Sequence, residues 1–86
     1  MKKIRVLLAD DHAVVRTGLK ALVDAQPDMS VVAEAGDGPS ALKLAAEAQP
    51  DVAVLDFSMP GLDGAETAEK LKHTCPNVKS LALTVH

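Results

Sequence analysis

Val52-Ala-Val-Leu-Asp56-Phe-Ser-Met-Pro60-Gly-Leu-Asp-Gly64 is the stretch that decides the fold. Its first four residues are apolar and Val-rich, which is typical of a strand buried on both faces in a parallel sheet. Asp56 would then lie at the carboxyl end of a central strand, where open α/β sheets place their ligand crevice. Pro60 fixes a backbone angle, and Gly61 and Gly64 accept conformations that other residues resist. The chain can therefore turn sharply while Asp56 stays in place.

The segments on either side of this stretch alternate between strand and helix patterns. In the second segment Val15, Leu19 and Leu22 have the i, i+4, i+7 spacing of one helix face. Asp63 and Glu66 have the spacing of an N-cap and its acidic partner, so we interpret Asp63 as a cap rather than a metal ligand. We expect strands at residues 4–9, 30–35 (at the sheet edge), 52–56 and 78–85, and helices at residues 13–25, 40–48 and 64–75. This β-α-β-α-β-α-β order predicts an α/β fold with a doubly wound parallel sheet and right-handed crossovers.

Composition limits the function classes. The 86 residues, 48% of them hydrophobic, suffice for one small domain with a real core. The net charge is -3 with scattered Lys and Arg residues, and Phe57 is the single aromatic residue, so neither a basic surface nor a base-stacking platform points to nucleic acid. Cys75 has no partner for an internal disulfide. Without a signal peptide or a long apolar run, we expect a soluble cytoplasmic chain with no membrane segment.

Acidic residues follow two of the predicted strands at the same end of the sheet. Asp10 and Asp11 follow the first strand, and Asp56 ends the third. Since adjacent strands are about 4.8 Å apart, the three carboxylates should share a pocket, where their repulsion calls for a cation such as Mg²⁺. Thr84, at the end of the fourth strand, would add a hydroxyl donor. This set of groups favours phosphoryl transfer onto Asp56.

Simpler interpretations exist for single residues of this region. A strand-end acid can merely cap the next helix, but Asp10 and Asp11 together with Asp56 and Thr84 favour the pocket. We interpret His12 as a surface or cap-adjacent residue rather than a ligand.

Four phrases of the sequence resemble one known family. They are Leu8-Ala-Asp-Asp-His12, Val15-Arg-Thr-Gly-Leu19, Leu55-Asp-Phe-Ser-Met-Pro-Gly-Leu-Asp-Gly64 and Leu83-Thr-Val-His86. Their content and spacing are similar to the CheY-like receiver domains of response regulators, in particular the NarL/FixJ subclass with LuxR-type output domains. The resemblance implies the flavodoxin-like strand order 2-1-3-4-5, which the sequence alone does not provide.

The resemblance also implies a role for each site residue. Asp56 would accept a phosphoryl group from the His of a sensor histidine kinase. Asp11, Asp56 and the backbone carbonyl of Ser58 would bind Mg²⁺ directly, with Asp10 acting through water. Thr84 would hydrogen-bond the phosphoryl group and move on its arrival, switching a surface that controls a transcription-regulating output.

The family pattern extends beyond these 86 residues. It continues with a helix, a fifth strand bearing a Lys that neutralises phosphoryl charge, and a final helix; Lys79 lies at the wrong end of its strand to replace that Lys. We therefore expect residues 1–86 to be the N-terminal portion of a receiver domain, with any DNA-binding domain absent. Because the fourth strand would be an unpaired edge, we expect self-association through residues 78–85, or order supplied by a partner or by the missing residues.

The residues alone leave two other functions open. A haloacid-dehalogenase-like phosphatase also uses a strand-end Asp with Mg²⁺, but it needs a second acid two positions later, where this chain has Ser58. The other is a receiver-like interaction or dimerisation module that is not phosphorylated in its truncated form. We expect a switch rather than an enzyme.

Overall fold

The alternating strands and helices predicted from the sequence are present. The computed structural model describes residues 3–56, 59 and 61–83. In chain order the elements are β1 (Ile4–Ala9), α1 (Ala13–Asp24), β2 (Met29–Ala35), α2 (Gly38–Ala48), β3 (Val52–Asp56), α3 (Gly64–Thr74) and β4 (Lys79–Leu83). The α/β fold class is confirmed.

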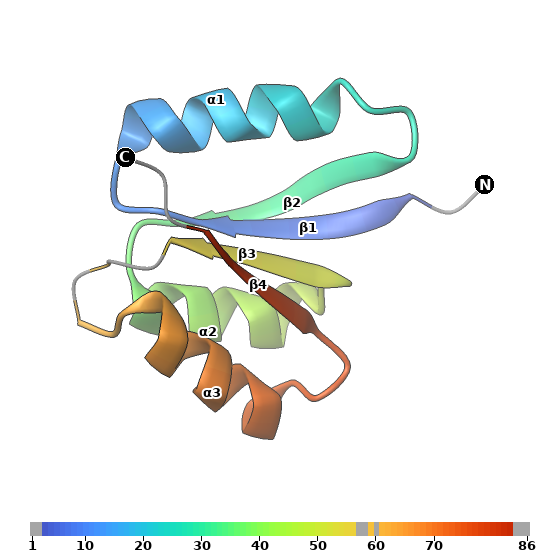
Figure 1. Cartoon of the computed structure of the whole chain (residues 1–86). Coiled ribbons are helices and arrows are strands. Elements are labelled where there is room, and N and C mark those ends of the chain that lie inside the picture. Colours follow the sequence, from blue (N-terminus) through green and yellow to red (C-terminus); the bar gives the residue numbers. More distant parts are fainter. Residues whose placement is uncertain (1–2, 57–58, 60, 84–86) are drawn as a thin grey trace.

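The four strands form one parallel sheet in the order β2-β1-β3-β4. This order confirms that the sheet is doubly wound, with β2 at one edge. α1 covers one face of the sheet, and α2 and α3 cover the other (Figure 1). The winding changes direction between β1 and β3, where Ala9 pairs with Leu55. Because Asp10 and Asp56 follow these paired residues, the topology sets both acids side by side at the switch point.

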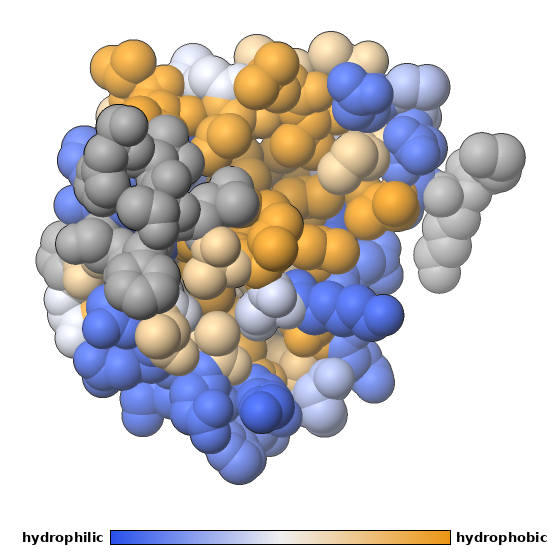
Figure 2. Space-filling model, viewed as in Figure 1, coloured by the Kyte–Doolittle hydropathy of each residue, from blue (hydrophilic) through white to orange (hydrophobic). Residues whose placement is uncertain are grey.

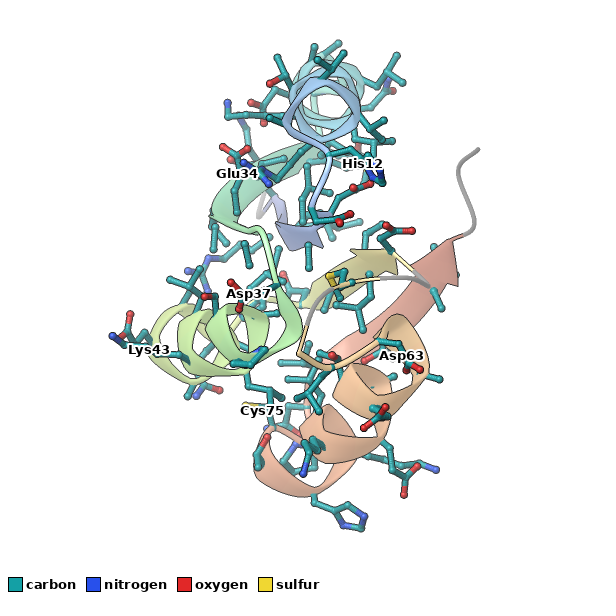
Figure 3. The ribbon with its side chains drawn as sticks, turned by 90° about the vertical axis from the view of Figure 1, so that its left-hand side faces the viewer. His12, Glu34, Asp37, Lys43, Asp63 and Cys75 are labelled. Atoms are coloured by element: carbon teal, nitrogen blue, oxygen red, sulfur yellow. The ribbon has the colours of Figure 1, made fainter. Side chains whose placement is uncertain are left out.

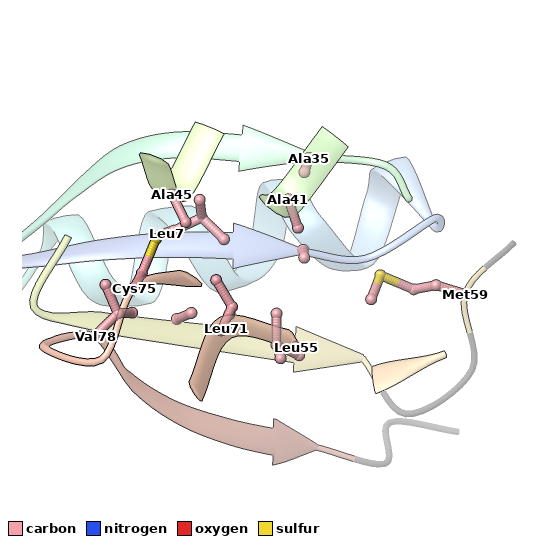
Figure 4. Packing of buried hydrophobic residues seen from close by; sticks show 11 residues of the cluster. Leu7, Ala35, Ala41, Ala45, Leu55, Met59, Leu71, Cys75 and Val78 are labelled. Atoms are coloured by element: carbon pink, nitrogen blue, oxygen red, sulfur yellow. The ribbon is translucent and has the colours of Figure 1, made fainter. Parts of the chain in front are cut away.

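The core lies between the sheet and the α2–α3 layer (Figure 4). On α3, Gly64 and Leu71 are buried, as is its C-cap residue Cys75, and Ala68 packs against the buried cluster. Cys75 is a free thiol that packs as a small apolar group. The buried cluster consists of Leu7, Ala9, Ala35, Ala41, Ala45, Ala53, Leu55, Met59, Leu71, Cys75 and Val78.

The prediction that β3 is buried on both faces holds for only one face. Ala53 and Leu55 are fully buried under α2 and α3, whereas Val52 and Val54 are only partly buried. On the opposite face α1 packs on β1 and β2, and no helix among the described residues packs over β3 or β4. The same asymmetry leaves Leu81 of β4 53% exposed.

The predicted apolar face of α1 was wrong at Leu22, which is 67% exposed. Val15, Leu19 and Val23 are partly buried instead, and no residue of α1 is fully buried. Since α1 packs on only two strands, much of its apolar surface has no neighbour within the described part of the chain. Hydrophobic residues accordingly gather on the upper half of the face seen in Figure 2, and hydrophilic residues gather over the lower, α2–α3 half.

Helix α2 begins two residues before the predicted start at Ser40. The Asp37 side chain accepts a hydrogen bond from the Ser40 amide at 2.7 Å, and Pro39 is tolerated in the first turn. Helix α3 begins as predicted, with the Asp63 side chain accepting from the Glu66 amide at 2.8 Å. Gly61 has the positive φ of 83° expected of the turn, whereas Gly64 is instead a buried first residue of α3.

β4 lies at the edge of the sheet, as predicted. The last two residues of the predicted strand, 84 and 85, lie outside the described residues. No helix within the described ranges has the length and apolar character needed to cross a bilayer.

Candidate functional site

Three acids meet where β1 and β3 end. Asp10 and Asp11 follow β1, and Asp56 is the last residue of β3. One ligand atom from each of these acids and from His12 can be chosen so that all four atoms lie within 4.8 Å of one another. The structure therefore brings together the three acids that the sequence predicted to converge. We call this set, Asp10, Asp11, His12 and Asp56, the acidic cluster.

Asp56 has the most deeply buried side chain among the acids of the cluster. Its side chain is 2% exposed, and neither carboxylate oxygen has a hydrogen-bond partner among the described residues. Burying an unpaired carboxylate is costly unless a cation or donors compensate it. The site therefore has an unmet requirement for positive charge at Asp56.

Asp10 and Asp11 have different surroundings. The Asp10 side chain is 4% exposed, and its Oδ1 accepts a hydrogen bond from the His12 amide at 2.7 Å. This contact forms a turn before α1. The N-cap position belongs to His12, so Asp10 does not cap the helix as the simpler interpretation had it. Asp11 is about a third exposed, with 32% of its side chain open to solvent. A hydrated ion can therefore reach Asp11 from the solvent.

The ring of His12 lies among these carboxylates. Its Nδ1 is 3.1 Å from Asp10 Oδ1, 3.0 Å from Asp11 Oδ1 and 3.9 Å from Asp56 Oδ2. The hydrogen bond to Asp10 and the charge of Asp11 raise the pKa of His12 above its ordinary value of 6.5. Among the ion pairs of the described residues, His12 is the one basic side chain within 4.0 Å of the cluster's carboxylates, and it carries a charge only when protonated.

His12 is a surface residue at the helix cap, as predicted, but the contact of its ring with the acids was missed from the sequence. The side chain is 55% exposed, and His12 occupies the N-cap position of α1 without a side-chain cap hydrogen bond. The available signal was its position directly after the acid pair, because a turn of this kind folds the third residue back over the first. Figure 3 shows His12 at the end of β1.

Arg16 supports the loop that bears the acid pair. Its guanidinium donates to the backbone carbonyl of Asp10 at 2.5 Å, and its Nε lies 3.4 Å from a carboxylate oxygen of Glu34. The side chain thereby connects α1 to the ends of β1 and β2. Arg16 contacts the backbone of the cluster rather than its carboxylates, so it positions the loop and leaves their charge unneutralised.

The remaining predicted site residues do not add to the cluster within the described part of the chain. Ser58 and Thr84 lie outside the described residues. Asp63 caps α3 and is not among the clustered acids (Figure 3). A groove of about 290 Å³ lies between α3 and β4, but its lining includes none of the clustered acids. The acidic cluster is therefore the candidate site.

Fold and site together define a doubly wound α/β domain with an acidic pocket at its topological switch point. Comparison with known proteins makes the assignment specific. The model of the response regulator receiver domain matches residues 6–86, and the chain belongs to that family. The members of this family are signalling switches of two-component systems rather than classical enzymes, and Mg²⁺ in the acidic pocket is typical of them.

Individual relatives agree with the family assignment. The chain is 46% identical over 81 residues to the transcriptional regulatory protein LiaR of Bacillus subtilis, covering 94% of this chain and 38% of LiaR. It is 46% identical over 67 residues to the nitrate/nitrite response regulator protein NarL of Escherichia coli, covering 78% of this chain and 31% of NarL. The chain thus spans less than two-fifths of the length of these relatives.

A solved structure gives the same result for the fold. The signal receiver domain of the response regulator NarL from Mycobacterium tuberculosis superimposes with a TM-score of 0.95 at 37% identity. The match covers 100% of this chain and 69% of that domain. The fold seen here is therefore similar to that of a NarL-type receiver domain.

Proposed function

We propose that this chain is a phosphoacceptor whose Asp56 receives a phosphoryl group from the His of a sensor histidine kinase. The observation that supports this most is the state of Asp56 itself. Its carboxylate is buried without a hydrogen-bond partner among the described residues, at the end of a central strand and beside two further acids. A helix cap or a structural ion pair would have its partner in place. An oxygen nucleophile that awaits a cation and a phosphoryl group does not.

The donor set of the cluster fits Mg²⁺. Its carboxylates are the hard oxygen ligands that this ion takes, commonly with water and a phosphoryl oxygen completing the shell. Asp11 and Asp56 would bind the ion directly together with the backbone carbonyl of Ser58, and Asp10 would act through water. Asp10 suits the indirect role because its Oδ1 already accepts from the His12 amide. When bound, the ion supplies positive charge against the carboxylates and the incoming phosphoryl oxygens.

The transfer exchanges one bond for another. A carboxylate oxygen of Asp56 attacks phosphorus, the P–N bond to the kinase His breaks, and the imidazole nitrogen keeps the electron pair and takes up a proton. The product is an aspartyl phosphate. The Asp56 side chain is only 2% exposed, which limits the approach of water to it. The exposed side of the pocket, at Asp11 and His12, is the side open to the donor.

The proposed output of the switch, regulation of transcription, is based on the similarity to known regulators. LiaR is a transcriptional regulatory protein that extends well beyond the matched region. We propose that residues 1–86 are the N-terminal portion of a cytoplasmic receiver domain, and that a DNA-binding output domain outside them regulates transcription. Thr84 would hydrogen-bond the phosphoryl oxygen and bias the surface toward its active state.

Acetyl phosphate with Mg²⁺ tests the proposal by intact-protein mass spectrometry, on this chain and on one extended through a complete receiver domain. We expect a gain of one phosphoryl group that is absent from Asp56→Asn. The matched control is Asp63→Asn, which retains a capping side chain outside the cluster and should keep the mass gain.

Two other outcomes would contradict phosphoacceptor function. No mass gain in either chain would favour an interaction or dimerisation module that is not phosphorylated. Steady release of phosphate from a small monoester would favour a phosphatase. Phosphorylation of the extended chain alone would show that residues outside 1–86 complete the site, and it would still support Asp56 as the acceptor.

A further inference from the structure

We infer that His12 supplies a nitrogen ligand to the ion bound by the acidic cluster. The pocket would then bind divalent transition ions such as Co²⁺ and Ni²⁺ more tightly, relative to Mg²⁺, than a pocket of oxygen ligands does. The inference rests on the metal site of the proposed function. It adds a residue that was predicted from the sequence not to be a ligand, and it names the class of ion that this residue selects.

The distances fit one coordination shell. Ligands at about 2.1 Å in octahedral geometry are separated by about 3 Å when adjacent and about 4.2 Å when opposite. His12 Nδ1 lies 3.0 Å from Asp11 Oδ1, which is an adjacent-ligand separation. Asp10 Oδ1, 3.1 Å from Nδ1, would stay outside the shell and act through water. The 3.9 Å to Asp56 Oδ2 is also within the span of one shell. Nδ1 would bind the ion in its unprotonated form, with the ring proton on Nε2.

The backbone holds the ring in position before any ion arrives. The His12 amide is bonded to Asp10 Oδ1 at 2.7 Å, and His12 is the N-cap residue of α1, with φ of -95° and ψ of 103°. These contacts place the base of the side chain, and the ring itself is held by the contact of Nδ1 with Asp10 Oδ1 at 3.1 Å. Arg16 contacts the carbonyl of Asp10, so it leaves the space between the carboxylates to the imidazole.

A separate observation points to a ligand at this place. Asp56 has both oxygens buried and unpartnered within the described residues, and the basic side chain that comes within 3.9 Å of it is the His12 ring. Carboxylate oxygens suit Mg²⁺ and Mn²⁺, whereas an imidazole nitrogen suits the later divalent metals, whose affinity rises from Mn²⁺ through Co²⁺ to Ni²⁺. A mixed set of nitrogen and oxygen ligands therefore shifts the balance toward the later ions.

The test compares Ni²⁺ and Mg²⁺ affinities, measured by calorimetry, in the wild type, His12→Phe and His73→Phe. Phe keeps a ring of similar shape without nitrogen. His73 is the matched control because it is 75% exposed on α3 and pairs only with Glu69 within the described residues. Since loss of even an outer-shell partner costs metal sites about 10–100-fold, we expect His12→Phe to lower Ni²⁺ affinity at least about tenfold. Mg²⁺ affinity should change by less than about threefold, and His73→Phe should change neither.

A spectroscopic readout identifies the nitrogen ligand. In the proton NMR spectrum, paramagnetic Co²⁺ strongly shifts the N–H resonance of an imidazole that is bound to it. This resonance disappears in D₂O because the proton exchanges with the solvent. We expect this signal in the wild type and in His73→Phe, and its loss in His12→Phe. A shifted signal that persists in His12→Phe would place the ion elsewhere as an adventitious ion only, and would overturn the inference. Circular dichroism of each variant checks that the fold is retained.

Failure of the inference can be distinguished from failure of the proposed function. If Asp56 is phosphorylated with Mg²⁺ but His12→Phe binds Ni²⁺ as tightly as the wild type, only the inference is wrong. If Asp56→Asn leaves the affinities for both ions unchanged, the acidic cluster does not bind the ion, and the inference and the proposed metal site fail together.

Discussion

At the scale of single residues, the described chain contains one buried carboxylate that has no hydrogen-bond partner in it. Asp56 is a buried carboxylate without a hydrogen-bond partner, beside two acids and one His. A protein selected only for stability would replace such a group with a neutral one, because an unsatisfied buried polar group costs free energy. The cost is consistent with a site kept for binding.

Asp56→Asn should therefore stabilise the metal-free chain. The amide has the shape of the carboxylate but no charge, so the variant avoids the cost of burying an unpaired charge beside two other acids. Urea unfolding in EDTA measures the change in the free energy of unfolding. Mg²⁺ should then raise the stability of the wild type and have little effect on the variant, since only the folded wild type binds the ion. Asp28→Asn, an exposed turn position, serves as the control; a variant less stable than the wild type in EDTA would contradict this account.

At the scale of elements, side-chain caps and close contacts between helices fix the ends of α2 and α3. Asp37 and Asp63 accept from the amides three residues ahead, at 2.7 and 2.8 Å. Gly38, the first residue of α2, faces the loop before α3: a Cβ there would lie 2.5 Å from Leu62 Cβ and 2.7 Å from Thr67 Oγ1. The start of α2 thus supports the loop that follows β3.

Asp37 gives a pH-dependent contribution to stability. The hydrogen bond from the Ser40 amide holds the pKa of Asp37 below 3.8 in the folded chain. A lowered folded pKa means that the contribution is present above pH 3.8 and is lost as the pH falls through the folded value. Asp37→Asn retains a capping oxygen but does not titrate. We expect the stability of the wild type relative to this variant to decrease between about pH 5 and about pH 3; a constant difference in unfolding free energy would contradict it.

Two glycine substitutions should change the stability of the chain in opposite directions. Gly38→Ala forces the Leu62 backbone and Thr67 to move, and overpacking of this kind costs about 1–3 kcal/mol. At Gly18, within α1, an added methyl group would meet nothing within 4 Å, so Gly18→Ala should stabilise the helix by about 0.5–1 kcal/mol. Thermal unfolding of the two variants measures both effects. Equal shifts in Tm would show that α2 does not pack closely against this loop.

At the scale of the whole molecule, the sheet is covered unevenly. β1 is buried on both faces from Val6 to Ala9, whereas β4 is an edge strand whose Leu81 is 53% exposed. Open backbone groups beside an apolar side chain favour pairing with another chain. The expectation of self-association through residues 78–85 therefore remains a prediction, now carried by β4 and by Leu81 in particular.

Light scattering coupled to size exclusion tests this prediction on the 86-residue chain. We expect oligomers at micromolar concentration, and dissociation toward the monomer in Leu81→Lys, because a charged side chain blocks an edge strand. Val14→Lys is the control, since Val14 is 86% exposed on α1, away from the strand edge. A clean wild-type monomer at micromolar concentration would count against edge pairing, as would an equal response to the two Lys variants.

The sequence by itself determined the order of the elements, the strand-end positions of Asp10, Asp11 and Asp56, and the Asp63 cap, because apolar periodicity and capping are local properties. Only the tertiary structure decided which face of α1 is covered, so Leu22 was wrongly placed in its apolar face. It also decided that β3 is fully buried on one face alone and that the His12 ring lies among the acids. Burial and contact depend on what packs against an element, and that neighbour comes from distant parts of the chain.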